Sequence, residues 1–375
     1  MNFLFHFILL TSASLYVILI VSAFIHWTRK ENLSSNPSGE PPGPVYLSVL
    51  IPFRNEAHHV PALLSALENQ TLNTGHWECI FIDDHSTDEG PGFIHRIGKE
   101  NIRVIFNPGT GKKSAIASAI PIAKGNFIVQ TDADCVMGKD WLLSIYNRLL
   151  DADLLVLAGP VCINKSTSLL SHFQSFDFIA FMGITHLGIR SRLWFLANGA
   201  NLIYNKGVYE TMDTSEFHYG LASGDDMFLI QAAARINKEK IVFLKDSLTI
   251  VKTQAIADFR TFIHQRLRWG SKTGKLKDWK IKVILGITLL FSLLLAGVSI
   301  AALLIKGWWP IAGILWVLKG SIDFIYLKKL APFFNQKIPL APYLLCTLIY
   351  PFYLTMIFIL SIFKRNYVWK GREIR

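Results

Sequence analysis

Long apolar stretches stand at both ends of this 375-residue chain, and they constrain its fold more than any other feature. One covers residues 3–27 and the other lies within residues 281–363, while the middle has the composition of an ordinary globular domain. Mean hydropathy is +0.34 and hydrophobic residues make up 51% of the chain, more than a purely soluble protein carries. The sequence therefore predicts a soluble domain set between membrane segments.

Residues 1–28 are expected to form a transmembrane anchor, because the apolar run is longer than a signal-peptide core. Arg29 and Lys30 follow it, and positive charge favours the cytoplasmic side, so we expect an external N-terminus and a cytoplasmic middle domain. Residues 29–44 are rich in Pro, Gly and Ser and are expected to be a linker.

Apolar runs at 45–53, 78–82, 103–106 and 127–129 have the length of buried strands, and each is followed by polar residues. Helical patterns separate these runs. Alternating strands and helices predict an α/β fold with a doubly wound, mainly parallel sheet, in which ligands bind at the carboxyl ends of the strands. We therefore expect the four polar loops to share one pocket.

Two carboxylates, Asp132 and Asp134, follow the fourth of these strands. Because side chains at positions i and i+2 of an extended chain point the same way, the pair can converge on a hard cation, Mg²⁺ or Mn²⁺, that holds a diphosphate. The alternative is a polar turn without a ligand. Lys112, in the segment Gly-Thr-Gly-Lys-Lys, offers a point charge to a phosphate or is a solvated lysine beside a turn.

The order of these motifs resembles that of membrane-anchored family 2 glycosyltransferases with the GT-A fold. The resemblance spans residues 47–270 and rests on IPFRNE, FIDDHSTD, GKKSAI, TDAD, GDDMFL and QRLRW. It implies a Rossmann-like, mixed but mainly parallel sheet combined with transmembrane helices. Two residues depart from the family pattern: Asp225 replaces the usual Glu, and His85 stands where Gly, Asn or Ser is commoner.

The resemblance also implies roles for individual residues. Asp226 is the expected general base, with Asp225 beside it as the second catalytic candidate, and Asp134 and Asp132 are the expected metal ligands. A helix N-cap is the structural alternative for the two catalytic candidates, and interfacial anchoring is the alternative for Trp269. The segment 197–201 resembles the acceptor side of the site or is a plain turn. The expected substrate-binding residues are Glu56, Asp83, Asp84, Lys112, Asp132, Gln265, Arg268 and Trp269.

These features together predict a membrane-bound, inverting glycosyltransferase that moves a sugar from a nucleotide sugar, with UDP the expected nucleotide, to a lipid or membrane-associated glycan. The alternatives are a processive polysaccharide synthase and a non-catalytic membrane protein that binds sugar nucleotides. A net charge of +11 is assigned to membrane lipids and an anionic donor rather than to nucleic acid, because the sequence contains no nucleic-acid recognition module. A multi-pass protein of a bacterial inner membrane is expected.

The remaining boundaries follow from apolar and basic patterns. Residues 45–255 are assigned to the cytoplasmic GT-A domain and residues 256–280 to an amphipathic interfacial segment that contains QRLRW. Residues 281–363 are assigned to a transmembrane region. Within it Lys319 and Asp323 lie four apart and can pair as a structural bridge, and the alternative is a role on a substrate path. The basic tail, residues 364–375, is expected in the cytoplasm, which requires an even number of crossings after the domain. The proline-rich last apolar segment is the expected exception to full spanning.

Overall fold

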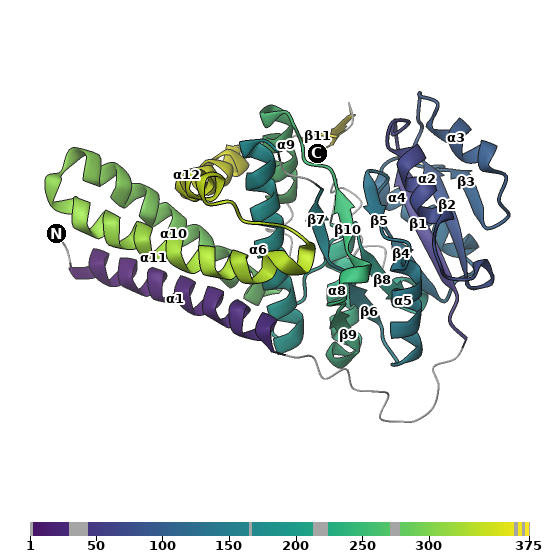
Figure 1. Cartoon of the computed structure of the whole chain (residues 1–375), viewed down its shortest axis with the longest axis horizontal. Helices are drawn as coiled ribbons and strands as arrows, with labels where there is room; N and C mark the ends of the chain where they lie inside the picture. Colours follow the sequence, from purple (N-terminus) through teal and green to yellow (C-terminus); the bar gives the residue numbers. More distant parts are fainter. Residues whose placement is uncertain are drawn as a thin grey trace. The chain divides into compact units, whose positions relative to one another are not determined.

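The computed structural model describes residues 3–29, 44–164, 167–212, 224–270, 278–363, 367–369 and 372–374. The chain divides into two compact units (Figure 1). The helical unit comprises Met1–Arg29, Lys165–Trp194 and Ala255–Tyr367, and the sheet unit comprises Lys30–Asn164, Phe195–Gln254 and Val368–Arg375. Most of the predicted linker, residues 271–277 of the predicted interfacial segment and half of the predicted tail lie outside the described residues.

The sheet unit contains a seven-stranded sheet with the strand order β3-β2-β1-β4-β8-β6-β9. Strands β1 to β4 pair in parallel, whereas β8 runs antiparallel to both of its neighbours. The prediction of a mixed, mainly parallel sheet is therefore confirmed. The strands are β1 Leu47–Phe53, β2 Trp77–Asp83, β3 Ile102–Phe106, β4 Phe127–Gln130, β6 Val156–Ala158, β8 Leu202–Asn205 and β9 Ile241–Phe243.

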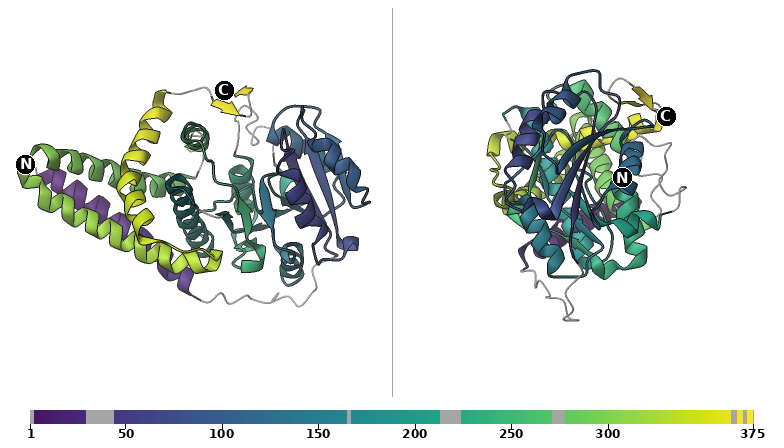
Figure 2. Two further views of the ribbon diagram at one scale, coloured as in Figure 1. Left: turned by 45° about the horizontal axis from the view of Figure 1, so that its top comes forward. Right: turned by 90° about the vertical axis from the view of Figure 1, so that its right-hand side faces the viewer.

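A smaller sheet has the order β5-β10-β7, with β5 Cys135–Met137, β7 Val161–Ile163 and β10 Val251–Thr253. Helices connect the strands of both sheets, as Figure 2 shows. They are α2 Val60–Glu68, α3 Gly90–Ile97, α4 Lys112–Ala119, α5 Trp141–Leu150, α7 Lys206–Glu210 and α8 Asp225–Ile236. A short ladder pairs β11 Tyr367–Trp369 with β12 Arg372–Ile374.

The sheet forms because its central strands are apolar on both faces. Every residue of β4 is buried, as are all but one in each of β1 and β2. Burial on both faces is expected where helices cover a parallel sheet. Gly125 marks the close approach to β1, since a Cβ atom there would lie 2.5 Å from the backbone nitrogen of Ser48. A larger residue at 125 would push β4 out of the sheet.

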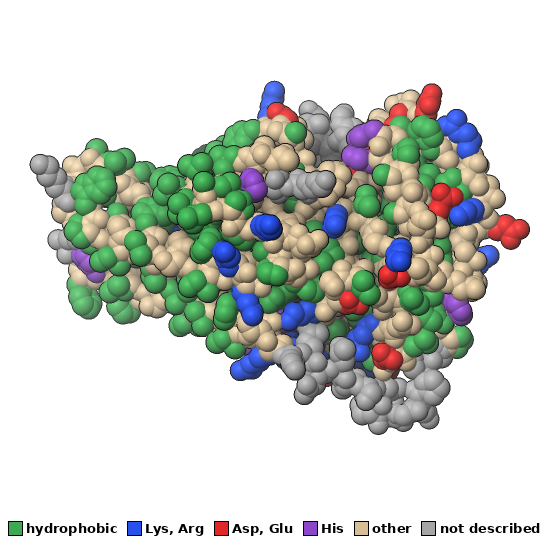
Figure 3. Space-filling model, in the orientation of Figure 1, with side chains coloured by type: hydrophobic (Ala, Val, Ile, Leu, Met, Phe, Trp, Pro, Cys, Tyr) green, Lys and Arg blue, Asp and Glu red, His purple; other side chains and the backbone are tan. Residues whose placement is uncertain are grey.

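The helical unit contains α1 Phe3–Thr28, α6 Leu169–Ser191, α9 Phe259–Gly270, α10 Trp279–Leu304, α11 Trp309–Leu330 and α12 Leu340–Phe363. Four helical segments, Phe3–Thr28, Trp279–Leu304, Trp309–Phe334 and Leu340–Phe363, are long and apolar enough to cross a membrane. Figure 3 shows apolar side chains covering the visible face of the long helices. Helix α12 continues through Pro351.

Helix α12 differs from the other three candidate spans in direction. In Figure 1 it is seen nearly end-on while α1, α10 and α11 run along the page, and in Figure 2 it runs across them. Its contacts with α10 are extensive. The last apolar segment is therefore one helix that lies crosswise on the bundle of α1, α10 and α11.

The sequence assigns 45–255 to one domain, whereas the structure places residues 165–194 in the helical unit. Helix α6 accounts for this interruption, because it packs on α1, α11 and α12. Its buried residues include Phe176, Ile179 and Met182. Gly183 allows close approach to α11, since a Cβ atom there would overlap the Tyr326 hydroxyl.

Candidate active site

The site lies where the order of strands reverses. The chain proceeds outward from β1 to β2 and β3 and then returns to pair β4 with the other side of β1. In open α/β sheets this switch point leaves a crevice outside the carboxyl ends of the two strands. Leu50 of β1 pairs with Gln130 of β4, so the loops after Phe53 and Gln130 begin on either side of the crevice.

Strand β4 ends in buried polar residues that are tied to the loop before β8. Thr131 donates a hydrogen bond from its hydroxyl to the carbonyl of Ala200 over 2.8 Å. Asp132 and Asp134 follow, and Asp134 accepts hydrogen bonds from Thr253 over 3.2 Å and from the Cys135 thiol over 3.6 Å. The tandem acids thus stand on a short, well-anchored turn between β4 and β5.

Lys112 lies against the first of these acids. It is the first residue of α4, and its Nζ atom lies 2.5 Å from Oδ1 of Asp132 and 3.5 Å from the carbonyl oxygen of Gly199. Burial lowers the pKa of Lys112, but the negative charges of Asp132, Asp225 and Asp226 outweigh it, so the pKa is raised. The lysine is therefore a fixed positive charge in a region of negative potential.

Asp225 and Asp226 open helix α8 directly after Gly224, which adopts a left-handed backbone. Asp226 accepts hydrogen bonds from the backbone N–H groups of Gly199 over 3.1 Å and Met227 over 2.8 Å. Asp225 instead accepts one from the Gln130 side chain over 2.8 Å. The two acids thus have different partners, and the dipole at the start of the helix favours their negative charge.

Gly199 is the contact point of these groups. A Cβ atom at this residue would lie 3.0 Å from Nε2 of Gln130, 3.1 Å from Nζ of Lys112 and 3.5 Å from Cβ of Asp226. The glycine backbone therefore bridges the lysine, which its carbonyl contacts, and the acid, to which its N–H group donates. Residues 197–201 were predicted to belong to the site only because they resemble the acceptor side of the site in family 2 glycosyltransferases.

Asp84 is buried beneath the loop that leads to Lys112. It is 1% exposed, and its Oδ1 atom accepts hydrogen bonds from the Asn107 side chain over 2.7 Å and from the Gly111 N–H group over 2.9 Å. Its predicted contact with a nucleotide stays a prediction. Asp83, at the end of β2, is half-buried and accepts a hydrogen bond from the Ser86 N–H group.

The loops after β1 and β2 each contain a non-glycine residue with a left-handed backbone conformation, and hydrogen bonds join the two loops. Asn55 has φ 51° and His85 has φ 62°, a region that non-glycine residues rarely occupy. The side chain of Asn55 accepts a hydrogen bond from the Thr87 N–H group, and its own N–H group donates to Ser86. Such strain persists only where surrounding structure enforces it, and it clusters at functional sites.

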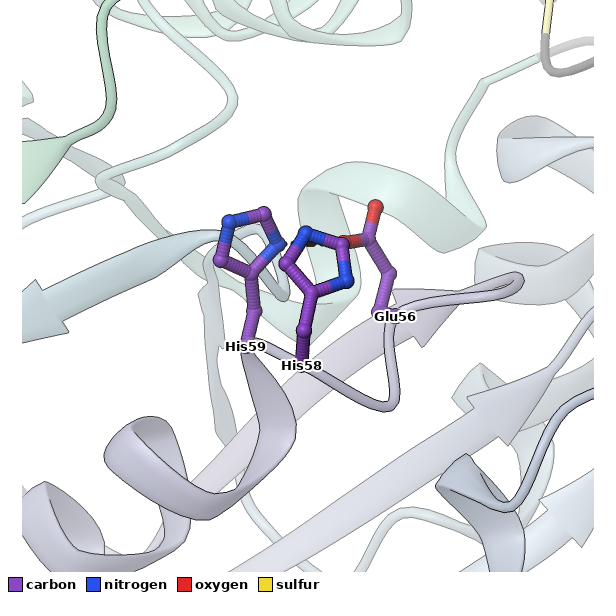
Figure 4. Close-up of side chains that lie close together, drawn as sticks. All are labelled: Glu56, His58 and His59. Atoms are coloured by element: carbon purple, nitrogen blue, oxygen red, sulfur yellow. Dashed lines mark hydrogen bonds and ion pairs between the residues drawn. The ribbon is translucent and has the colours of Figure 1, made fainter.

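Glu56 follows on the same loop and is 8% exposed. His59, at the start of α2, lies with its Nδ1 atom 2.6 Å from a carboxylate oxygen of Glu56 (Figure 4). His58 also lies close, and each of the three side chains offers a ligand atom within 4.8 Å of the others. The Glu56 carboxylate is thus fixed by a neighbour of its own loop, and its predicted contact with substrate stays a prediction.

The three residues predicted from QRLRW lie in the other unit. Gln265, Arg268 and Trp269 are half-buried residues of α9. The Trp269 ring lies edge-on to Phe178 of α6, with 5.9 Å between the ring centroids. Their predicted roles toward donor and acceptor stay predictions.

The carboxylates meet the chemical requirements of a divalent cation. Asp132 is a part-exposed carboxylate that already faces a cationic group, and Asp134 stands two residues further on. Oxygen donors of this kind suit Mg²⁺ and Mn²⁺, which take their remaining ligands from water and phosphate. The same carboxylates raise the pKa of Lys112, in keeping with a position that favours positive charge.

Comparison with known proteins agrees with the fold. Over 94% of its length the chain superposes on 95% of the mannosyltransferase PcManGT from Pyrobaculum calidifontis, solved with GDP-Man and Mn²⁺, with a TM-score of 0.58 and 17% sequence identity. The sheet unit is thus a GT-A glycosyltransferase fold. Residues 48–211, somewhat less than half of the chain, match the family described as Glycosyl transferase family 2.

Two curated relatives share short regions with the chain. A poly(ribitol-phosphate) beta-glucosyltransferase of Bacillus spizizenii is 36% identical over 106 residues, which are 27% of this chain and 17% of that protein. A beta-monoglucosyldiacylglycerol synthase of Nostoc is 30% identical over 105 residues, 27% of this chain and 22% of that protein. The matched region is thus about a fifth of each relative's length.

A longer match is with a dolichyl N-acetyl-alpha-D-glucosaminyl phosphate 3-beta-D-2,3-diacetamido-2,3-dideoxy-beta-D-glucuronosyltransferase of Methanococcus voltae. That protein is 22% identical over 240 residues, which cover 61% of this chain and 73% of the relative.

Gln130, which donates a hydrogen bond to Asp225, was not among the predicted site residues. A signal was present, because Gln130 is a buried polar residue that ends an apolar strand immediately before the acidic motif. Asn107 was also missed. It is fully buried and links Asp84 to the Ser114 hydroxyl of α4, an arrangement that only the folded loop reveals.

Proposed function

We propose that the protein is a membrane-bound, inverting glycosyltransferase that moves a sugar from a nucleotide sugar to a lipid or membrane-associated glycan. The observation that carries the proposal is the bridge at Gly199, whose carbonyl contacts Lys112 and whose N–H group donates to Asp226. Through Gly199, the ammonium group of Lys112, which can bind a diphosphate, lies close to the carboxylate of Asp226, which can accept a proton. Those are the two charges that sugar transfer from a nucleotide diphosphate requires.

The donor diphosphate is held by positive charge at the end of β4. Lys112 offers its ammonium to phosphate oxygens, and its raised pKa keeps that group protonated at neutral pH. Asp132 and Asp134 would hold a divalent cation, Mg²⁺ or Mn²⁺, which when bound offsets the negative charge of the leaving diphosphate. Asp83 is proposed to accept a hydrogen bond from the nucleoside of the donor, for which UDP is the proposed nucleotide.

Asp226 acts as the general base. Two N–H groups fix its carboxylate at the start of α8, so that it can take the proton of an acceptor hydroxyl. A single displacement by that hydroxyl inverts the anomeric carbon. Asp225 is the second candidate, and its carboxylate accepts a hydrogen bond from the side-chain amide of Gln130.

A lipid acceptor agrees with the helical unit and with the names of two relatives, a glucosyldiacylglycerol synthase and a dolichyl-linked transferase. The helices α1, α10 and α11 run alongside one another and are proposed to span the membrane, while α12 lies across them along its surface. Gln265, Arg268 and Trp269 are proposed to contact the donor diphosphate and the acceptor from α9.

Transfer can be tested with the full chain in membrane vesicles. Vesicles are supplied with radiolabelled UDP- or GDP-hexoses and with diacylglycerol or a polyprenyl phosphate, and label is counted in the lipid extract. We expect label in lipid from the full chain and none from Asp226→Asn. Label found only in a water-soluble polymer would favour a processive synthase, and no label with any donor would overturn the proposal.

A further inference from the structure

Arg266 is a buried charge on α9 for which the proposed reaction has no use. Its side chain is 9% exposed, and Nη1 lies 2.7 Å from Oδ2 of Asp177 on α6. The guanidinium also lies over the ring of Trp269, 4.6 Å from its centroid, and over that of Phe262 at 5.0 Å. The same side chain therefore pairs with one helix and supports the ring of a predicted substrate residue.

Tyr350 of α12 connects this pair to a second one within the helical unit. Its hydroxyl lies 3.5 Å from Oδ1 of Asp177, and the Nζ atom of Lys319 lies 5.1 Å from its ring centroid. Lys319 pairs with Asp323 over 2.5 Å, and Asp323 accepts a hydrogen bond from the Tyr16 hydroxyl over 2.8 Å. One line of charged and aromatic groups thus joins α9 to α6, α12, α11 and α1.

Arg266 points in a different direction from α9 than two of the predicted substrate residues, Gln265 and Arg268. Residues two apart on a helix are about 200° apart, so Arg268 is nearly opposite Arg266. Gln265 and Arg268, three apart, share a face. Arg266 is therefore turned into the helical unit while the half-buried face of Gln265 and Arg268 is turned away from Asp177.

We propose that Asp177 and Arg266 are positioning residues that fix α9, and with it the side chains of Gln265, Arg268 and Trp269, for sugar transfer. The inference rests on the proposed function, which gives those side chains their contacts with substrate. Helix α9 spans 12 residues, and a helix of that length needs tertiary contacts to hold its conformation. Removing the carboxylate of Asp177 leaves the guanidinium of Arg266 buried without its ion-pair partner, which is strongly destabilising.

A double-mutant cycle on the full chain in detergent tests the pair. The variants are Asp177→Asn, Arg266→Met and the two combined, with Arg266→Lys as the conservative change. Hydrogen exchange of peptides from residues 259–270 is measured beside kcat and KM for the nucleotide sugar. The control is Asp153→Asn, which removes an exposed acid paired with Lys240 in the sheet unit.

We expect each single variant to raise exchange in α9 and to lower kcat by about tenfold, with KM for the donor changed less than about threefold. The combined variant should be no worse than the worse single variant, because neighbours in one ion pair are not additive. Arg266→Lys should recover part of the loss, and Asp153→Asn should change neither quantity. Additive effects, or unchanged exchange in α9, would overturn the proposal.

Two further results separate the explanations. If Arg266→Met raises KM for the donor about tenfold while Asp177→Asn does not, the arginine binds the donor directly and positioning is wrong. If the single variants of Asp177 and Arg266 fail to fold, Tyr350→Phe is used instead, because it removes only the hydroxyl that contacts Asp177. Unchanged hydrogen exchange in α9 of that variant would overturn the link to α12. A wild-type chain that transfers no sugar refutes the proposed function, yet the exchange cycle still reports whether the pair holds α9.

Discussion

The Nζ atom of Lys112 lies 2.5 Å from Oδ1 of Asp132, so the lysine that is proposed to bind phosphate is paired with an acid that is proposed to bind a cation. The two residues come from different strand ends, since Lys112 opens the helix after β3 and Asp132 follows β4. Their pairing shows that both loops face the same part of the crevice. It also means that a change in either charge alters the position of the other group.

Lys112 is expected to stay protonated throughout the working pH range. Its pKa is raised relative to an unfolded value of about 10.4, so its charge interactions stabilise the fold fully below that pH and are lost only as pH rises through the raised pKa. The pH profile of kcat/KM should therefore show no lysine titration up to about pH 10. A lysine-dependent fall below that pH, abolished in Lys112→Arg, would contradict this assignment.

Removal of divalent cations is expected to reduce donor turnover to background. The two carboxylates at the end of β4 would lose the ion that offsets the diphosphate charge. The measurement is turnover of purified protein in chelator, followed by add-back of Mg²⁺ and Mn²⁺ separately. Asp134→Asn should require a higher concentration of either metal, and full activity in chelator without bound metal would refute the site.

Asp226→Asn is expected to slow transfer by roughly a hundredfold or more while nucleotide-sugar binding is retained, because a positioned base contributes that much. Binding is measured by calorimetry and turnover separately. Asp225→Asn is the matched control, because it changes the adjacent acid, which accepts a hydrogen bond from the Gln130 side chain. A larger loss in Asp225→Asn than in Asp226→Asn would exchange the two roles.

Asn201→Ala is expected to lower the free energy of unfolding by about 3 kcal/mol. Asn201 is fully buried, donates from its amide to the carbonyls of Pro160 and Thr249, and accepts from the Trp141 indole. Alanine would leave those groups buried without partners. Thermal unfolding followed by tryptophan fluorescence measures the change, with the exposed Asn69→Ala as a control expected to cost well under 1 kcal/mol.

The tail after α12 is expected on the same side of the membrane as the sheet unit. Three apolar helices follow the sheet unit, but α12 lies across α10, so only α10 and α11 would cross. Positive residues after Phe363 favour the cytoplasm as Arg29 does. Single cysteines at Ser361→Cys and Glu373→Cys, in a chain without its native cysteines, should resist an impermeant reagent in sealed cells. Labelling of Glu373→Cys would place the tail outside.

Much of the sheet could be predicted because its strands obey simple patterns. The apolar run LSVLIPF is buried along nearly its whole length, as a central parallel strand requires, and acids follow β2 and β4 at the expected edge. The predicted pairing of Lys319 with Asp323 is confirmed as well, because four residues on a helix fix the distance between side chains.

Other features depend on contacts that sequence spacing does not contain. The bridge through Gly199 joins residues 87 and 27 positions away, and the ion pair of Asp177 with Arg266 joins helices 89 residues apart in sequence. The burial of Asp84 is likewise set by a later loop, whose Gly111 N–H group donates a hydrogen bond to it. Burial of a loop residue is set by neighbours that the local pattern does not identify.

Helix α6 interrupts the sheet unit in sequence, and this has a consequence for how the protein must be made. During synthesis α1 and α6 emerge long before α10, α11 and α12. The apolar side of α6 therefore cannot pack against α11 and α12 until those helices have been synthesised. Strands β8 to β10 are likewise synthesised only after α6. A soluble fragment covering residues 45–254 would keep α6 without the helices that cover Phe176 and Met182, and it should aggregate on the ribosome or soon after release. We therefore expect membrane insertion of the helical unit and folding of the sheet unit to depend on each other during synthesis.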